Sequence, residues 1–372
     1  MIHRFLAWFQ YLAVLVRKEF LVIFSDPANR TVLFAPVLIQ SLLFGYAATY
    51  DVNNVDYAIL DLSHSRTSTE LIAKLDGSGI FHRTAMLENS QQIAPIIYER
   101  QALAVITIPE DFEQKLTQQQ ASPIQVIVDG RNSSTAGAAS AYISTIVQQF
   151  NQQYLQNSPA LTIENRTWYN PNHESRWGIM PSLIAALSMM QTLLLSSLSV
   201  AREREQGTFD QLLVTPYTPV QIMIGKALPP IFVGLIQSTI IFLIILFWFQ
   251  IPMQGSIGLL YLGLISFNVA VVGVGLSISA IALNMQQAMF FTFLLIMPLM
   301  LLSGLLTPVQ NMPQFLEIAT YINPLRFGID LVLRVYLEGA EFAQVKYDFI
   351  PMIVLTCITL PLAAWLFRNR LS

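Results

Sequence analysis

The chain has 372 residues, of which 54% are hydrophobic and 12% are charged, and its formal net charge is −3. Soluble globular proteins carry about 25% charged residues, so this composition excludes an ordinary cytoplasmic enzyme and a disordered chain. The near balance of charge leaves no basic surface for nucleic acid. The single cysteine, Cys357, excludes an internal disulfide and a cysteine-based zinc or iron–sulfur site. The composition predicts an integral membrane protein.

The first segment, residues 1–30, is predicted to form a helix at the cytoplasmic surface of the membrane. Its apolar run, residues 5–16, is too short to cross a bilayer. The run is followed by three charged residues, Arg17, Lys18 and Glu19. Aromatic side chains would lie at headgroup depth and basic ones toward lipid phosphates, and Asp26-Pro27 is expected to end the helix. A cleaved signal peptide is the alternative, and the lack of a small-residue cleavage site argues against it.

Six apolar runs without a charged residue follow, each about as long as a helix that crosses 30 Å of hydrocarbon. They comprise residues 31–50, 180–200, 227–249, 257–283, 288–308 and 349–367. The fold class is therefore predicted to be an α-helical integral membrane protein with six transmembrane helices. Residues 180–372 would form a five-helix transmembrane domain.

The distribution of basic residues predicts the orientation, because short cytoplasmic loops are enriched in lysine and arginine. With the N-terminus inside, nine basic residues lie in the internal segments: Arg4, Arg17, Lys18, Arg30, Arg202, Arg204, Lys226, Arg368 and Arg370. The short external segments hold three, which are Arg326, Arg334 and Lys346. Both termini are therefore expected in the cytoplasm.

Residues 51–179 are predicted to form an inserted extracytoplasmic α/β domain. Strand-like runs at 55–60, 102–108 and 124–128 alternate with helical patterns at 68–75, 110–118 and 135–152. Such alternation is typical of an α/β layer that packs on its own core.

The chain lacks the motifs of several kinds of chemistry. It has no Gly-x-x-x-x-Gly-Lys-Ser/Thr loop for ATP, no His-Glu-x-x-His and no Gly-x-Ser-x-Gly. We therefore expect no catalytic residue, no metal site and no cofactor in this chain. The predicted spans also lack the ionisable groups of an ion-coupled carrier. The spans contain four notable neutral polar residues: Gln40, Gln191, Gln237 and Asn268. Such residues favour hydrogen bonding between helices. The alternative is that they line a path for an amphiphilic cargo.

A charged segment directly follows the second predicted span. It comprises Arg202, Glu203, Arg204, Glu205, Gln206, Gly207 and Thr208. The spacing of Phe209, Leu212 and Leu213 predicts a short amphipathic helix that ends at Pro216. By itself this pattern, in the loop 202–218, fits docking into a groove on a soluble partner and an ordinary solvated anchor equally well.

The order of several motifs resembles that of type 2 ABC transporter permeases. The run from Glu203 to Thr208, followed by residues 212–216, resembles the cytoplasmic loop of this family. Further similar positions are Lys18-Glu19, Asp26-Pro27, Asn170-Pro171, Pro181, Ser303-Gly304, Pro308, residues 311–313, residues 323–325 and Arg334. The resemblance covers nearly the whole chain and is strongest to drug-efflux-like exporter permeases with a large extracytoplasmic domain.

The resemblance implies a non-catalytic permease subunit of an ATP-driven exporter in the bacterial inner membrane. The permease would pair with a second permease, identical or paralogous, and an ABC ATPase subunit under each half would bind ATP and magnesium. The loop from Arg202 to Thr208 would couple to that ATPase beside the N-terminal helix, and residues 309–348 would be an outer re-entrant segment. A periplasmic adaptor protein and membrane lipid are further expected partners, and the substrate would be amphiphilic or drug-like. A ligand-binding receptor and a scaffold that does not transport are the alternatives.

Overall fold

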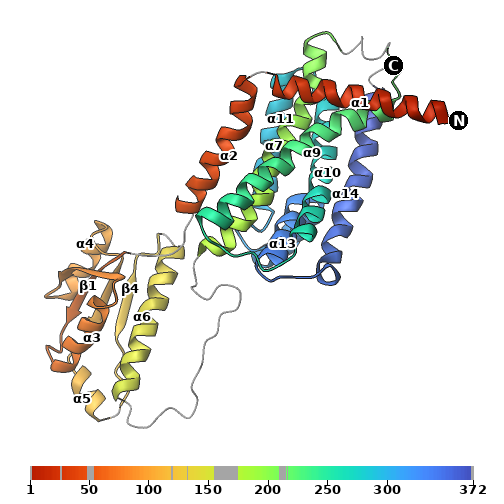
Figure 1. Ribbon diagram of the computed structural model, residues 1–372. Coiled ribbons are helices and arrows are strands. Elements are labelled where there is room, and N and C mark those ends of the chain that lie inside the picture. Colours follow the sequence, from red (N-terminus) through yellow and green to blue (C-terminus); the bar gives the residue numbers. More distant parts are fainter. Residues whose placement is uncertain are drawn as a thin grey trace. The chain divides into compact units, whose positions relative to one another are not determined.

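The computed structural model describes residues 2–25, 27–47, 54–118, 120–131, 133–154, 175–208, 215 and 217–369. Two compact units divide the chain (Figure 1): Met1–Thr49 with Arg176–Ser372 form a helical unit, and Tyr50–Ser175 form an α/β unit. Several predicted features lie outside the described residues: Asp26, the end of the first span at 48–50, Asn170-Pro171, residues 209–214 and Pro216.

The helical unit is built from long apolar helices, which confirms the class of an α-helical membrane protein. These are α1 (Ile2–Phe24), α2 (Pro27–Ala47), α7 (Ser175–Glu205), α9 (Pro219–Leu243), α10 (Ile257–Ile281), α11 (Met285–Leu301) and α14 (Phe342–Asn369). Among the described residues, four helices are long and apolar enough to cross a membrane: α7, α9 with its π-helical extension Ile244–Trp248, α10 and α14. Because α2 and α11 contribute shorter apolar helices, six spans remain a prediction.

Three helices extend beyond the apolar runs from which they were predicted. Helix α1 continues through the charged residues 17–19 to Phe24, and α14 begins at Phe342 instead of residue 349. Helix α9 begins at Pro219 because Thr218 and Gln221 form a reciprocal capping box. Lys226, counted with the internal segments because the third apolar run begins at residue 227, therefore lies inside this apolar helix.

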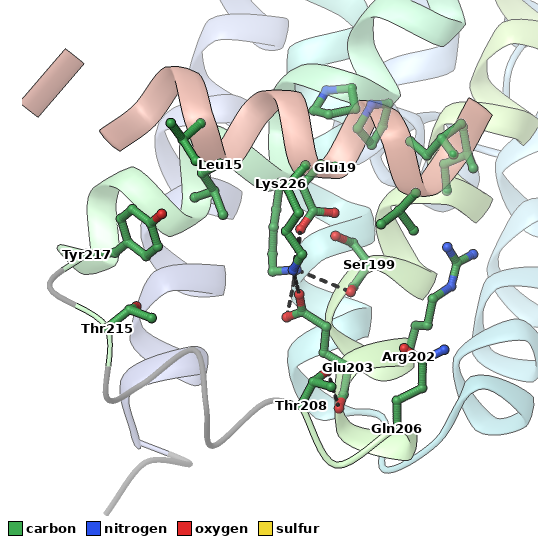
Figure 2. A pocket seen from close by; sticks show the side chains of 17 residues that line it. Leu15, Glu19, Ser199, Arg202, Glu203, Gln206, Thr208, Thr215, Tyr217 and Lys226 are labelled. Atoms are coloured by element: carbon green, nitrogen blue, oxygen red, sulfur yellow. Dashed lines mark hydrogen bonds and ion pairs between the residues drawn. The ribbon is translucent and has the colours of Figure 1, made fainter. Parts of the chain in front are cut away.

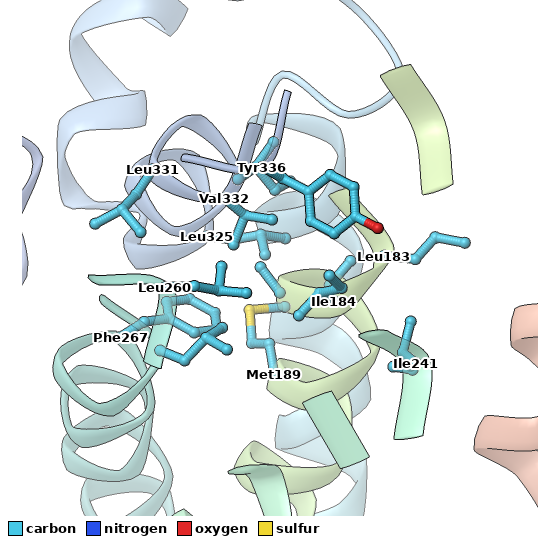
Figure 3. Packing of buried hydrophobic residues seen from close by; sticks show 14 of the residues in the cluster. Leu183, Ile184, Met189, Ile241, Leu260, Phe267, Leu325, Leu331, Val332 and Tyr336 are labelled. Atoms are coloured by element: carbon cyan, nitrogen blue, oxygen red, sulfur yellow. The ribbon is translucent and has the colours of Figure 1, made fainter. Parts of the chain in front are cut away.

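The apolar core of the helical unit joins side chains of α7, α9, α10 and α13 (Pro324–Tyr336), as Figure 3 shows, and it also includes Phe349 and Met352 of α14. Phe267 of α10 is fully buried, and a side chain added at Gly328 of α13 would collide with its ring. The segment between α11 and α13 forms three short helical turns: Val309–Asn311, α12 (Gln314–Ala319) and Thr320–Ile322. This segment is helical, and its placement as a re-entrant segment at the outer membrane face stays a prediction.

The α/β unit contains a four-stranded sheet in the order β2-β1-β3-β4. Its strands are β1 (Val55–Asp61), β2 (Phe81–Met86), β3 (Ala104–Ile108) and β4 (Gln125–Val128), with β1 parallel to β2 and β3, and β4 antiparallel to β3. Its helices are α3 (Arg66–Asp76), α4 (Ile93–Tyr98), α5 (Phe112–Thr117) and α6 (Ser133–Tyr154). Helices α3, α5 and α6 pack on the sheet face that carries Tyr57 and Ile59, and α4 packs on the opposite face at Ala58.

Candidate functional site

Four charged side chains from three helices meet at the C-terminal end of α7 (Figure 2). Lys226 of α9 has a side chain that is 0% exposed, and its Nζ lies 2.9 Å from Glu203 Oε2 and 3.3 Å from Glu19 Oε1. Lys18 Nζ of α1 lies 2.7 Å from Glu203 Oε1. The chain therefore holds two positive and two negative charges together where α1, α7 and α9 converge.

The sequence brings α1 onto α9 through a small residue and a hydrogen bond. A Cβ built at Gly225 would lie 2.5 Å from Leu15 Cδ2, so this close approach requires glycine. Gln221 Nε2 donates to the carbonyl oxygen of Trp8 at 3.0 Å. Because residues four apart share one helix face, the contact at Leu15 also directs Glu19 toward Lys226.

The balance of charges is what makes this burial tolerable. The Lys226 ammonium has a third acceptor in the carbonyl oxygen of Ser199 at 3.3 Å, so its charge is well satisfied. Burial is the largest influence on the Lys18 ammonium and acts to lower its pKa, but the hydrogen bonds and charges of Glu203 and Glu19 together outweigh burial, so the pKa is raised. Removing one partner from such a buried group typically costs about 3–5 kcal/mol, because the remaining charge is left uncompensated.

The next two residues of α7 attach the same helix end to the turn between α10 and α11. Arg204 Nη1 donates to the carbonyl oxygens of Ala280 and Ala282 at 3.0 and 2.8 Å, where α10 ends. Glu205 Oε2 accepts from the backbone N–H of Met285 at 2.8 Å, where α11 begins. A cation at a helix C-terminus and an anion at a helix N-terminus both complement the helix dipole.

We call the set Lys18, Glu19, Glu203, Arg204, Glu205 and Lys226 the α7 junction. Through these side chains, one turn of α7 is bonded to α1, α9, α10 and α11. A displacement of this turn therefore acts on four other helices at once.

Helix α7 ends in a turn that depends on glycine. Gly207 has a φ of 67°, and the backbone N–H of Thr208 donates to the carbonyl oxygen of Glu203 at 3.0 Å. A Cβ at Gly207 would meet nothing within 4 Å, so glycine is favoured here by backbone conformation and not by close packing within the chain. The amphipathic helix predicted around Phe209, Leu212 and Leu213 lies outside the described residues.

A pocket of about 420 Å³ lies between α1, α7 and α9 (Figure 2). Its polar lining includes Lys18, Glu19, Arg202, Glu203, Gln206, Thr208 and Lys226. Its apolar lining includes Val14, Leu15, Val22, Ile23, Leu195, Pro229 and Pro230. Across the described part of the chain, no group of three or more His, Cys, Asp or Glu residues is arranged to hold a metal ion.

The residues predicted from the sequence to form the coupling site do not all lie together in the structure. Residues 202–205 are the last turn of α7 and not a loop, and Gln206 is exposed beyond them. Glu203 and Glu205, which belong to the segment expected to couple to the ATPase, have their partners within this chain. Arg17 is exposed and lies apart from the junction. Lys226 was missed, although the pattern Thr218-Pro-Val-Gln221 signals a helix start eight residues before it.

The four neutral polar residues of the spans separate into two pairs. Asn268 and Gln237 are fully buried and bonded: Thr192 Oγ1 donates to Asn268 Oδ1, and Gln237 Nε2 donates to the Leu33 carbonyl, both at 2.8 Å. Gln40 and Gln191 are half-buried. The first pair supports hydrogen bonding between helices, and the lining of a transport path stays a prediction for all four.

Comparison with known proteins places these features in a family. The family described as "ABC-2 family transporter protein" matches residues 31–366. The chain is 40% identical over 365 residues to the Escherichia coli K12 protein named "Probable multidrug ABC transporter permease YbhR", covering 97% of this chain and 99% of that protein. It is 28% identical to "Probable multidrug ABC transporter permease YbhS" of the same organism, with 90% of each chain covered. The chain is also 28% identical to "Inner membrane transport permease YhhJ" of Escherichia coli K12, and the aligned region covers 95% of this chain and 96% of that protein.

Proposed function

The chain belongs to the ABC-2 family of transporter proteins as a type 2 ABC permease, and on that premise we propose that it is the non-catalytic membrane subunit of an ATP-driven exporter. A separate ABC ATPase would bind ATP and magnesium and dock against Gln206 and the segment that follows it. The substrate would be an amphiphilic or drug-like compound, since relatives are named multidrug permeases. The α7 junction is the observation that carries this proposal.

The junction offers a mechanism by which a partner could move the helices. Force applied at Gln206 acts on the last turn of α7, because Gln206 directly follows Glu205, the last residue of this helix. Arg204 and Glu205 would pass this displacement to the α10–α11 turn through direct hydrogen bonds. Glu203 would transmit the displacement to α1 and α9, because moving Glu203 away from Lys226 would leave a buried charge without its partner.

The assembled exporter would contain a second permease, identical or paralogous, beside this one. With both termini in the cytoplasm, as the basic residues predict, the α/β unit Tyr50–Ser175 would lie in the periplasm, where it could meet an adaptor protein. The permease itself would carry no catalytic residue, and its part in the cycle would be mechanical.

Two kinds of variant test separately the docking of the ATPase and the transmission of its motion to the helices. Gln206→Trp places a bulky group on an exposed residue whose side chain makes no hydrogen bond with the described part of the chain. Glu205→Gln keeps the size of its side chain but removes the charge that faces the start of α11. Gln114→Trp, on an exposed position of α5 in the α/β unit, is the matched control for the added bulk.

The measurement is co-purification of the tagged permease with its ATPase, followed by substrate-stimulated ATP hydrolysis and export. We expect Gln206→Trp to lose recovery of the ATPase, while Glu205→Gln keeps the complex but shows several-fold weaker export per ATP. Gln114→Trp should match the wild type in both respects. Wild-type export by both Gln206→Trp and Glu205→Gln would show that this helix end is only an anchor.

A further inference from the structure

The pocket between α1, α7 and α9 is lined by one more positive charge than negative. Lys18 and Lys226 are balanced by Glu19 and Glu203, with N···O distances of 2.7–3.5 Å. Arg202 is the remaining charged lining residue, and the described residues offer its guanidinium neither a hydrogen bond nor an ion pair. In Figure 2 it lies apart from the ion cluster of Glu19, Glu203 and Lys226. Among the residues that the structure describes, this guanidinium is therefore an unused cation.

The unused cation has the geometry of an anion receptor. A guanidinium carries five N–H donors in a planar fork, which matches two oxygens of a phosphate or carboxylate. Gln206 and Thr208, which also line the pocket, add neutral polar groups near the end of α7. Because Glu19 and Glu203 are already neutralised by lysines, they do not compete strongly for Arg202.

The other part of the lining is apolar and continues onto the outside of α1. Val14 and Val22 line the pocket and are nevertheless exposed, Val14 by 59%. Leu21, one residue before Val22, is 56% exposed. Apolar side chains on the outer face of a surface helix are typical of contact with lipid acyl chains. The pocket thus combines a cationic group with an apolar wall that extends to this face.

We propose that this pocket binds an anionic phospholipid, with Arg202 paired to the phosphate and the acyl chains against Val14 and Val22. The lipid would fill the space between α1 and α7 and so add to the contacts that hold α1 on the α7 junction. This inference concerns the permease alone and does not depend on the docking of an ATPase.

A phospholipid accounts for the lining better than other anions do. Inorganic phosphate would pair with Arg202 but leave the apolar wall uncovered. Acyl chains lying against this wall would cover its apolar surface, which a small anion does not do.

Lipid binding to the purified full-length chain in a neutral detergent tests the proposal. Phosphatidylglycerol and phosphatidylcholine of identical chain length are the probes, and native mass spectrometry gives stoichiometry and apparent Kd. We expect one tightly bound phosphatidylglycerol per chain, with at least about tenfold weaker binding of phosphatidylcholine, whose headgroup carries no net charge. Inorganic phosphate should fail to displace the lipid at millimolar concentration.

Matched variants locate the site. Arg202→Gln should weaken phosphatidylglycerol binding by about tenfold or more, and Arg202→Lys, which keeps the charge but loses the fork, should lie between it and the wild type. Arg30→Gln removes an exposed arginine of α2 that does not line the pocket, and it should bind normally. Val22→Trp should weaken lipid binding without any change of charge. A monodisperse elution profile confirms that each variant is folded.

Four results would overturn the proposal. Wild-type binding by Arg202→Gln would remove its central residue, and equal losses in Arg202→Gln and Arg30→Gln would indicate general charge attraction. Displacement of the lipid by inorganic phosphate would indicate a site for small anions. Loss of ATPase recovery by Arg202→Gln, with unchanged lipid binding, would assign the guanidinium to a protein partner.

Discussion

The described part of the helical unit contains two ion clusters that differ in how far apart in the sequence their paired residues lie. In the α7 junction, Lys226 pairs with Glu19, which lies 207 residues earlier in the sequence. This ion pair joins α9 to α1, two helices that are not neighbours in the chain. The second cluster lies around Arg334, whose Nη1 is 3.1 Å from Asp348 Oδ2, only 14 residues away. Arg334 also lies within 4 Å of Asp330 and Glu338, one helical turn to either side.

The two clusters lie toward opposite ends of α10. Its last carbonyls bind Arg204, while Gly255, just before its first turn, touches the backbone of Val335 in α13. A helix of 25 residues is about 37 Å long, which is enough to cross the hydrocarbon of a bilayer. One end therefore holds distant parts of the chain together, and the other holds a local pair of helices, α13 and α14.

The largest expected effect concerns which end faces the cytoplasm. With Cys357 replaced by serine, a cysteine at Ser256 should react with a membrane-impermeant reagent in intact cells, because the basic residues place this exposed position outside. A cysteine at Gln206 should react only after the membrane is opened. Labelling of a cysteine at position 206 in intact cells would contradict the predicted orientation and would place the α7 junction on the outer side of the membrane.

Breaking the long-range cluster should destabilise the chain strongly. Lys226→Met leaves Glu19 and Glu203 buried with one lysine between them, and we expect a loss of about 3–5 kcal/mol in the free energy of unfolding. Adding Glu203→Gln restores the balance of charge and should recover part of the loss. Unfolding by SDS titration in mixed micelles measures both. Equal stability of the single and double variants would contradict a balanced cluster.

Breaking the local cluster should cost less. In Asp348→Asn, Arg334 keeps Asp330 and Glu338 as neighbours, and its side chain is partly exposed to solvent. We therefore expect a loss of about 1–2 kcal/mol in the same titration. A loss equal to that of Lys226→Met would show that the local pair is as important as the long-range one.

The smallest expected effect concerns the turn that follows the α7 junction. Gly207→Ala must adopt a positive φ and should cost about 1 kcal/mol, whereas Gly207→Asn, which tolerates this conformation, should cost less. Gly178→Ala is the matched control, because this glycine lies within α7 with open space around it. Gly178→Ala should be neutral or slightly stabilising. If both alanine variants behave alike, the conformation of Gly207 has no energetic role.

Apolar runs predicted the helical class well but placed the helix ends poorly. The third predicted span began directly after Lys226, so this lysine was left outside the span although Thr218 and Gln221 start the helix before it. In the α/β unit, β2 was missed because Phe81 is its one fully buried residue, which leaves no alternating pattern. Helix α4 was missed because it has six residues with a proline among them.

The candidate site was predictable in location but not in partners. The segment from Arg202 to Glu205 was identified as important, and Lys18-Glu19 was placed beside it through the family resemblance. No local pattern indicates that Glu203 pairs with both Lys18 and Lys226, since these contacts join three helices remote in sequence. Such pairing depends on tertiary packing, above all on the approach of Leu15 to Gly225.

The separation of Glu19 and Lys226 has a consequence for biosynthesis. Translation proceeds at roughly 5–20 residues per second, so Lys226 is made roughly 10–40 s after the glutamate 207 residues before it. During that interval α1 exists without α9, and Glu203 is also made late in it. The contacts of α1 with α9 can therefore form only after α9 has been made, and α1 spends that interval without this partner.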